Sequence, residues 1–167
     1  MKNKILITGT RSGLGEFLSK KYPNPICITR ENPLTDEIIS EGVDTIIHCA
    51  FNQNMSELNL VNYKIYEDNI NLTKKLLKIP HRRFVYISTC QVSELNSKSQ
   101  PTPYIIMKAL NEHIIREQSK NYLILRPSGL VGDDKKRNSL HKLMNNEDIT
   151  LTGESVNDFI LFDDVYN

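Results

Sequence analysis

The sequence predicts an α/β protein with a doubly wound parallel sheet and helices on both faces. Five short apolar runs alternate with longer segments of helical periodicity. The runs carry apolar residues on both faces, as in strands buried on both sides of a parallel sheet. Three glycines lie at the junction of the first run and the first helical segment. A chain of 167 residues is long enough to bury one domain core.

The apolar runs give the strands of this sheet in order. They are KILIT (4–8), ICIT (26–29), TIIHCA (45–50), RFVYIS (83–88) and YLILR (122–126). Helical periodicity between them predicts helices over 13–21, 35–41, 56–79 and 103–118. Strand–helix alternation with right-handed crossovers makes the strands parallel. Beyond residue 132 the pattern weakens, and we expect a helix near 138–146 and short strands near 149–152 and 159–162.

Composition argues against several classes of function. A net charge of +1 gives no broad basic surface for nucleic acid. The three cysteines, Cys27, Cys49 and Cys90, are widely spaced, which disfavours a disulfide framework or a zinc site. No apolar run reaches the ~18 residues of a membrane span, and the first is too short for a signal peptide. We therefore expect a cytoplasmic protein with reduced thiols, no metal, and neither a membrane nor a nucleic-acid partner.

The segment TGTRSGLG (8–15) joins the first strand to the first helix. Bare backbone at Gly9 and Gly13 lets N–H groups approach a pyrophosphate, and the helix N-terminus adds its positive dipole end. A side chain at Gly15 would push the helix off the sheet. This predicts a Rossmann-type dinucleotide-binding domain over 1–132, although a purely structural glycine turn is the alternative. The loop residues expected at the cofactor are Gly9, Arg11, Ser12, Gly13, Leu14 and Gly15.

The end of the second strand bears on the choice of cofactor. An acidic residue there binds the adenosine ribose of NAD, whereas a basic one accommodates the extra phosphate of NADP. This strand ends CITRE, with Thr29 in the usual acidic position and Arg30 after it. Arg30 and Arg11 favour NADP, with NAD as second choice. In the alternative, Arg30 is solvated and Glu31 binds the ribose.

Tyr104 and Lys108 are four residues apart on the helix 103–118 and so share one face. Thr89 ends the preceding strand, at the edge where ligands bind in parallel sheets. A lysine ammonium ~4 Å from the phenol favours the phenolate by roughly 4 kcal/mol at an effective dielectric of about 20. That corresponds to about three pKa units, enough to make Tyr104 a proton carrier near neutral pH. The alternative is an amphipathic surface helix with a snorkelling lysine.

Two polar residues have simpler interpretations. His48 lies within an apolar strand, which indicates a core or strand-end histidine rather than a chemical one. Arg126 precedes Pro127 at a strand end, and we expect it to form a structural ion pair.

Seven segments in order resemble the short-chain dehydrogenase/reductase family, extended branch, which includes the NAD-dependent epimerases and dehydratases. They are KILITGTRSGLGEFL, GVDTIIHCAF, EDNINLTKKLLK, RFVYISTCQVSE, PYIIMKALNEHIIRE, LILRPSGLVGDD and ITLTGESVNDFILFDDV. The resemblance implies an NAD(P)-dependent oxidoreductase acting on a nucleotide sugar as ketoreductase or epimerase. It also implies a partial substrate-binding region over 133–167 and a homodimer through helices 56–79 and 103–118.

The same resemblance implies roles for individual residues. Tyr104 would be the acid/base, and Lys108 would lower its pKa and bind the nicotinamide ribose. Thr89 would hold the substrate oxygen, and Asn69 would support its helix and a bound water. Ala50, at the end of the third strand, and Pro127 would lie along the cofactor.

The sequence also departs from the family pattern. Cys90 and Gln91 follow Thr89 where dehydratases carry Asp-Glu, which disfavours sugar dehydration. Residues 30–44 leave little room for the usual third strand, and Asn157 stands where many members use arginine. Extended members are about twice as long as this chain. These departures keep two alternatives open: an inactive cofactor-binding module acting as sensor or partner subunit, and a fragment of a longer protein.

Overall fold

The main sheet has five parallel strands in the order β2-β1-β3-β4-β5. A computed structural model describes residues 4–52, 65, 67–96, 100–132, 139–149, 152 and 154–167. The strands are β1 (Ile5–Thr8), β2 (Ile26–Ile28), β3 (Val43–His48), β4 (His81–Ile87) and β5 (Tyr122–Leu125). Each strand overlaps one predicted run, and neither end differs from that run by more than two residues. The predicted α/β fold class is confirmed.

The strand order reverses at β1, which places the ligand crevice of this fold. From β1 the chain first passes to β2 on one side, with Thr8 beside Ile28. It then passes to β3 on the other side, with Thr8 beside His48. Ligands of doubly wound sheets bind at such a switch point, beyond the carboxyl ends of the strands. After β2 the chain enters α2 (Asp36–Glu41) and then β3, so residues 29–42 hold no further strand, as their length predicted.

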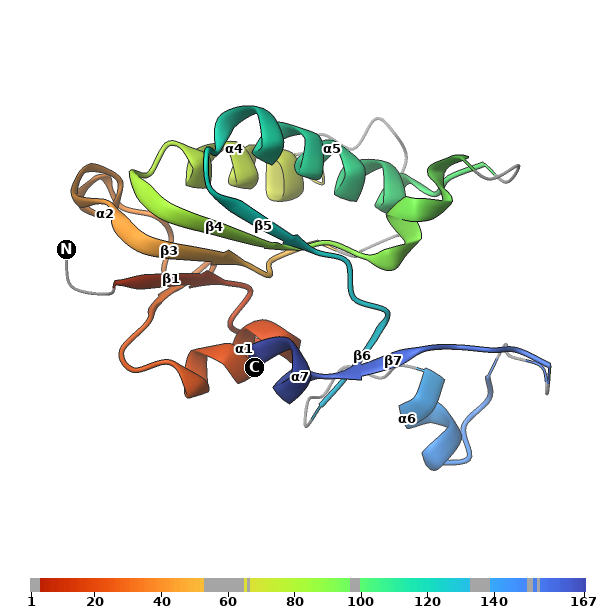
Figure 1. Cartoon of the computed structure of the whole chain (residues 1–167). Coiled ribbons are helices and arrows are strands. Elements are labelled where there is room, and N and C mark those ends of the chain that lie inside the picture. The colour runs from red at the N-terminus through yellow and green to blue at the C-terminus, as the bar shows by residue number, and fades with distance from the viewer. Residues whose placement is uncertain are drawn as a thin grey trace.

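Helices cover both faces of the sheet (Figure 1). On one face lie α4 (Leu72–Leu77) and α5 (Pro103–Gln118), and on the other α1 (Gly13–Lys21) and α7 (Phe162–Tyr166). Because successive strand residues point to opposite faces, neighbours in sequence enter different cores. Leu6 and Ile46 pack with α4 and α5 residues. Ile7 and Ile47 pack with α1 residues and Phe162.

Capping fixes the start of α5, which has the predicted bounds. The Thr102 hydroxyl accepts a hydrogen bond from the Ile105 N–H, and Pro103 occupies the first turn. Tyr104 is thereby held in the first turn of the helix. The predicted helix 56–79 is described only in part: a π-helical turn, η2 (Glu67–Asn71), leads into α4, and residues 53–64 and 66 lie outside the described residues.

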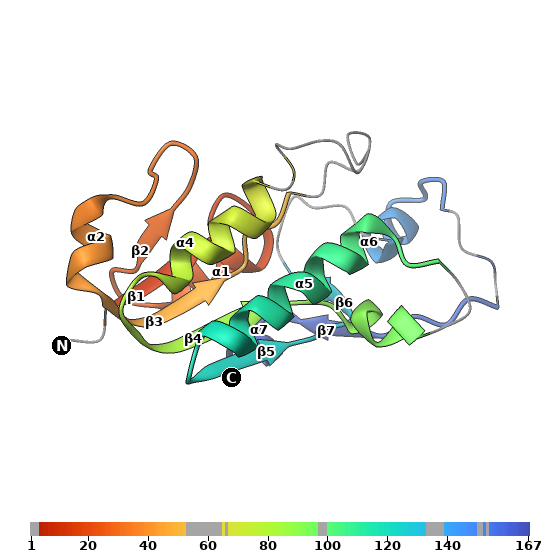
Figure 2. The same ribbon diagram turned by 90° about the horizontal axis from the view of Figure 1, so that it is seen from above.

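The C-terminal region carries a second, two-stranded parallel sheet. It pairs β6 (Gly129–Val131) with β7 (Phe159–Leu161), and α6 (Ser139–Met144) lies between them in sequence. Figure 2 shows this sheet beyond the carboxyl ends of the main strands. We did not predict β6. Of the strand expected near 149–152, residues 150 and 151 lie outside the described residues, and 149 and 152 are in no strand. The division into 1–132 and 133–167 stays a prediction.

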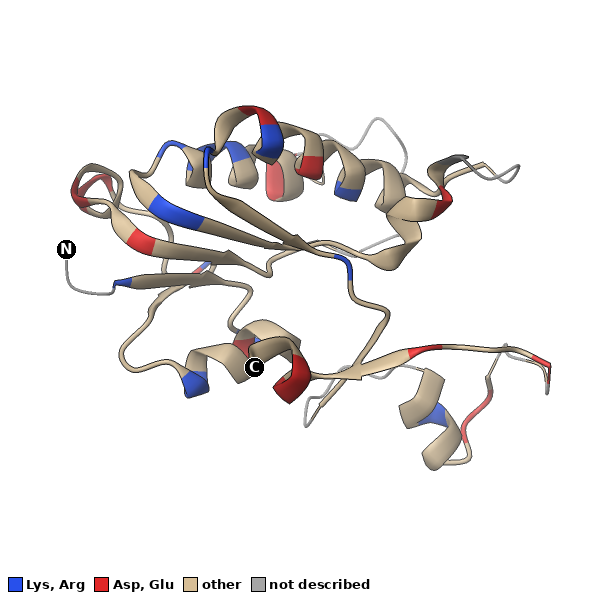
Figure 3. Cartoon of the chain, in the orientation of Figure 1, with Lys and Arg blue, Asp and Glu red and all other residues tan. Residues whose placement is uncertain are grey.

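Charged residues of both signs are spread over the ribbon (Figure 3). Several form exposed ion pairs, such as Lys4 with Glu41 and Arg82 with Asp44. In the described part of the chain, no helix combines the length and apolar character needed to cross a bilayer.

Candidate active site

A cleft of about 350 Å³ opens at the carboxyl ends of β1, β3 and β4. The glycine loop and α1 form one wall, and α5 and the segment after β5 contribute to the other. The cleft brings together most of the predicted site residues, namely Gly9, Ser12, Gly13, Leu14, Gly15, Ala50, Thr89, Tyr104, Lys108 and Pro127. Sequence reasoning missed other lining residues, among them Cys49, Phe51, Ser88 and Phe162. Arg11, Arg30 and Asn69 do not line it.

The glycine loop has the geometry of a phosphate cradle. Gly9 and Gly13 adopt φ values of +76° and +62°, which other residues rarely adopt. A Cβ at Gly9 would lie 2.8 Å from the Ala50 nitrogen. The N-cap residue Ser12 makes no side-chain hydrogen bond to the helix, so its hydroxyl does not occupy the first N–H groups of α1. The loop therefore fits a dinucleotide pyrophosphate.

Gly15→Ala is expected to disrupt this cradle. Its Cβ would lie 2.4 Å from the Gly9 carbonyl oxygen, which is backbone and must move. We expect a loss of roughly 1–3 kcal/mol in the free energy of unfolding, measured by urea denaturation, because the added methyl group overpacks the site. Lys20→Ala, on the exposed side of the same helix, is the control and should change stability by less than about 0.5 kcal/mol. Wild-type stability in Gly15→Ala would contradict this account of the loop.

Tyr104 and Thr89 lie together in the cleft. The Tyr104 ring packs edge-on against Phe51, with centroids 5.1 Å apart. Burial raises the pKa of the Tyr104 phenol, and a hydrogen bond with the Thr89 hydroxyl offsets only part of that rise. The net effect is a raised pKa, so our expectation that Lys108 lowers the pKa of Tyr104 is wrong.

The surroundings of Lys108 explain the difference. Its Nζ is buried and donates a hydrogen bond to the Ile87 carbonyl at 2.7 Å. It also lies 4.4 Å from the Phe51 ring centroid and 5.9 Å from that of Tyr104. The ammonium is thus held by a strand-end carbonyl and aromatic faces. Burial of the phenol then dominates the pKa of Tyr104.

Asn69 lies behind the cleft in the π-helical turn η2. Its Oδ1 accepts a hydrogen bond from the Asn52 N–H at 2.7 Å, and its Nδ2 donates to the Asn52 carbonyl at 3.2 Å. This pair fixes the chain just after Phe51, a cleft residue. Asn69 is therefore placed to position the cleft wall.

His48 is a core residue, as we interpreted it. The ring is fully buried between the hydroxyls of Thr8 and Thr73. Burial, assisted by the charge of Lys108, lowers the pKa of His48 to about 3. The ring is consequently neutral at physiological pH.

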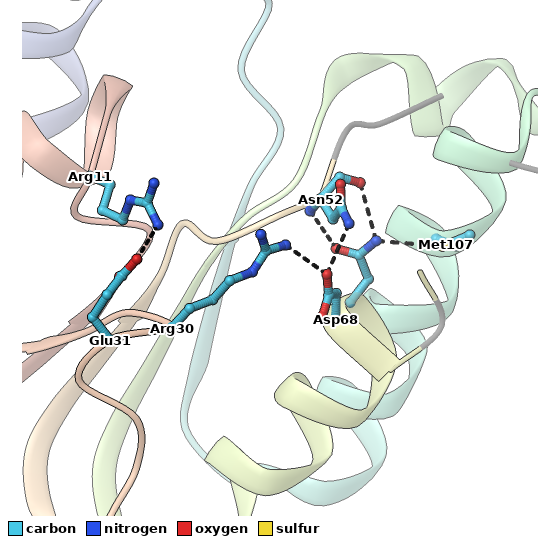
Figure 4. A network of polar contacts seen from close by, with 7 residues as sticks. Arg11, Arg30, Glu31, Asn52, Asp68 and Met107 are labelled. Carbon is cyan, nitrogen blue, oxygen red and sulfur yellow. Dashed lines mark hydrogen bonds and ion pairs between the residues drawn. The ribbon is translucent and has the colours of Figure 1, made fainter. Parts of the chain in front are cut away.

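Arg11 and Arg30 lie where the loop after β2 approaches the glycine loop. Each pairs with an acid: Arg11 with Glu31 at 2.6 Å and Arg30 with Asp68 at 2.8 Å. Figure 4 shows the two pairs and the link from Asp68 to Asn52. Asp68 was not anticipated from the sequence.

A buried carboxylate joins three elements behind Thr89. Glu112 of α5 accepts hydrogen bonds from Ser88 at 2.6 Å and from Arg126 at 2.9 and 2.6 Å. Arg116, one turn along α5, adds a contact of 2.9 Å. The ion pair predicted for Arg126 is confirmed. Its partner was missed, although Glu112 continues the four-residue spacing of Tyr104 and Lys108.

The described part of the chain contains neither a cluster of metal ligands nor a readily ionised thiol at Cys49. No group of three or more His, Cys, Asp or Glu residues there is placed to hold a metal ion. Burial raises the pKa of the Cys49 thiol to about 12, so this cleft residue stays protonated.

The fold and the cleft define the class as a Rossmann-type α/β protein with a cleft at the switch point of its sheet. The chain belongs to the NAD dependent epimerase/dehydratase family, whose model matches residues 5–167. A comparison with the curated proteins finds no significant match.

Solved structures of low sequence identity share the fold. UDP-glucuronic acid 4-epimerase from Bacillus cereus superposes with a TM-score of 0.71 at 21% identity, over 97% of this chain and 70% of that one. UDP-glucose 4-epimerase from Thermotoga maritima gives 0.69 at 21% identity, with the same coverage. dTDP-4-dehydrorhamnose reductase from Bacillus anthracis gives 0.68 at 22% identity, over 87% of this chain and 59% of that one.

Proposed function

We propose that the protein is an NADP-dependent oxidoreductase that acts on a nucleotide sugar as a ketoreductase or epimerase, with NAD as the second choice of cofactor. One observation carries the proposal. Tyr104 and Thr89 share a single cleft with Lys108 and the glycine loop. The nicotinamide cofactor, when bound, supplies or accepts the hydride.

The protein's own groups would bind, orient and move a proton. The glycine loop and the start of α1 would hold the pyrophosphate, and Ala50 and Pro127 also line the cleft. The Tyr104 phenol would give a proton to the substrate oxygen or take one from it, and the Thr89 hydroxyl would orient that oxygen. Lys108, buried and hydrogen-bonded to Ile87, would stabilise negative charge that develops on the phenol. Asn69 would position the cleft wall through Asn52.

The proposal of a nucleotide-sugar substrate rests on family membership and on the solved neighbours. The Bacillus cereus epimerase was crystallised with UDP-glucuronic acid and NAD, and the Bacillus anthracis reductase with NADP. Cys90 and Gln91 supply no carboxylate next to Thr89, which favours carbonyl reduction or epimerisation over dehydration.

The test is a fluorescence titration with NADPH and NADH, followed by turnover assays with UDP-, GDP- and dTDP-sugars. We expect saturable binding of at least one cofactor and turnover of at least one sugar that depends on Tyr104. No binding of either cofactor at millimolar concentration would overturn the proposal.

A second candidate is an inactive NAD(P)-binding module that acts as a sensor or partner subunit. The raised pKa of Tyr104 favours it, because a phenol that resists ionisation is a poor base. Cofactor binding without turnover of any sugar would support this candidate. The homodimer through helices 56–79 and 103–118 and the cytoplasmic location remain proposals, and sedimentation of the purified protein would test the first.

A further inference from the structure

An acid lies beside the arginine that follows β2, where the proposed cofactor would place its adenosine. Asp68, in η2, forms an ion pair with Arg30, which follows β2. The Arg30 guanidinium spans the space between these two elements (Figure 4). The Arg30 side chain is 68% exposed, whereas that of Asp68 is 27% exposed.

Asp68 is the fixed partner of this pair. Its Oδ2 also accepts a hydrogen bond from Asn52 Nδ2 at 2.9 Å. The Asn52 backbone is in turn tied to the buried Asn69 by two hydrogen bonds. The carboxylate therefore belongs to a connected framework, and the long, exposed arginine reaches over to it. The pair holds Arg30 toward η2.

A 2′-phosphate on adenosine would need the same guanidinium. Carboxylate and phosphate oxygens are both strong acceptors for arginine, so they compete for its N–H groups. Glu31 engages Arg11 in the same way on the other side of the loop. A cofactor with a free 2′-hydroxyl brings no charge to either arginine and leaves both pairs intact.

We propose that Asp68 is a specificity-determining residue that competes with the adenosine 2′-phosphate for Arg30 and so weakens the preference for NADP over NAD. The inference rests on the proposed function, because it assumes that adenosine binds beside β2. It assigns cofactor selectivity to a residue that follows the third strand of the sheet rather than the second.

The test uses Asp68→Asn, which removes the charge while an amide oxygen can still accept the Asn52 hydrogen bond. Calorimetry measures binding of two probes, adenosine 2′,5′-bisphosphate and 5′-AMP. We expect the variant to bind the bisphosphate roughly 2- to 5-fold more tightly, the range that an exposed ion pair commands, with no change for AMP. Glu41→Gln, which removes an acid from the ion pair with Lys4, is the matched control for net charge and should leave both affinities unchanged.

Arg30→Ala completes the test as a double-mutant cycle. With Arg30 absent, Asp68→Asn should no longer improve binding of the bisphosphate. Equal improvement in both backgrounds, or no improvement in either, would overturn the inference while AMP binding still supported the proposed function. If wild-type protein and variants bind neither probe, both the inference and the proposed function fail.

Discussion

Tyr104→Phe is expected to lower kcat for the sugar substrate by roughly 10²- to 10⁴-fold, the usual contribution of a positioned proton carrier. The phenylalanine ring keeps the edge-on contact with Phe51, so the cleft retains its shape. Only the phenol hydroxyl is lost. Cofactor affinity, measured by fluorescence titration, should therefore stay at the wild-type value while turnover falls.

The pH dependence gives the same prediction a second readout. Since burial raises the pKa of Tyr104, the phenol is protonated at neutral pH and is ready to act as an acid. Carbonyl reduction should then be active near pH 7, and the reverse oxidation should accelerate as pH rises toward the phenol pKa. Tyr122→Phe, at an exposed site on β5, is the control and should change neither kcat nor the profile. Full activity in Tyr104→Phe would remove Tyr104 from the mechanism.

The sequence was sufficient for the parts of the fold that depend on local pattern. The bounds of α1 and α5 were predicted to the residue, because glycine and proline signals mark their first turns. Strand β6 was missed because Gly129–Val131 is too short to show a period and pairs with a strand thirty residues away. The π-helical turn η2 was also missed, since no sequence period distinguishes it from the α-helix it precedes.

Site residues could be predicted where they lie near strand ends, and their partners mostly could not. Thr89 and the glycine loop were placed because parallel strands deliver their carboxyl ends to one edge. Asp68 and Glu112 meet their arginines 38 and 14 residues away in sequence, a pairing that only the folded chain determines. The direction of the Tyr104 pKa was wrong for the same reason, because Lys108 is held by a carbonyl that the sequence does not place.

Glu112→Gln is expected to lower the free energy of unfolding by roughly 3 kcal/mol, as removing one partner of a buried charge cluster does. The carboxylate is fully buried and is shared by Ser88, Arg126 and Arg116. The side chains of Arg126 and Arg116 are 37% and 42% exposed, so water replaces part of the interaction that they lose with Glu112. The expected destabilisation therefore lies at the low end of the range for such clusters. Urea denaturation at pH 7 measures it.

Acid titration separates this effect from a simple packing defect. Burial opposes ionisation of Glu112, but hydrogen bonds from Arg126, Ser88 and Arg116 outweigh it and lower the pKa of the carboxyl. A carboxyl whose pKa is lower in the folded than in the unfolded chain stabilises the fold at pH values above the ordinary glutamate pKa of about 4.3. This stabilisation is lost as the pH falls through the folded-state pKa. The stability gap between wild type and Glu112→Gln should therefore shrink in acid. Glu117→Gln, on the exposed face of the same helix, should change stability by less than about 0.5 kcal/mol at any pH. A gap that stays constant down to pH 3 would assign the loss to packing rather than to the charge that joins α5 to the strand ends beside Thr89 and Pro127.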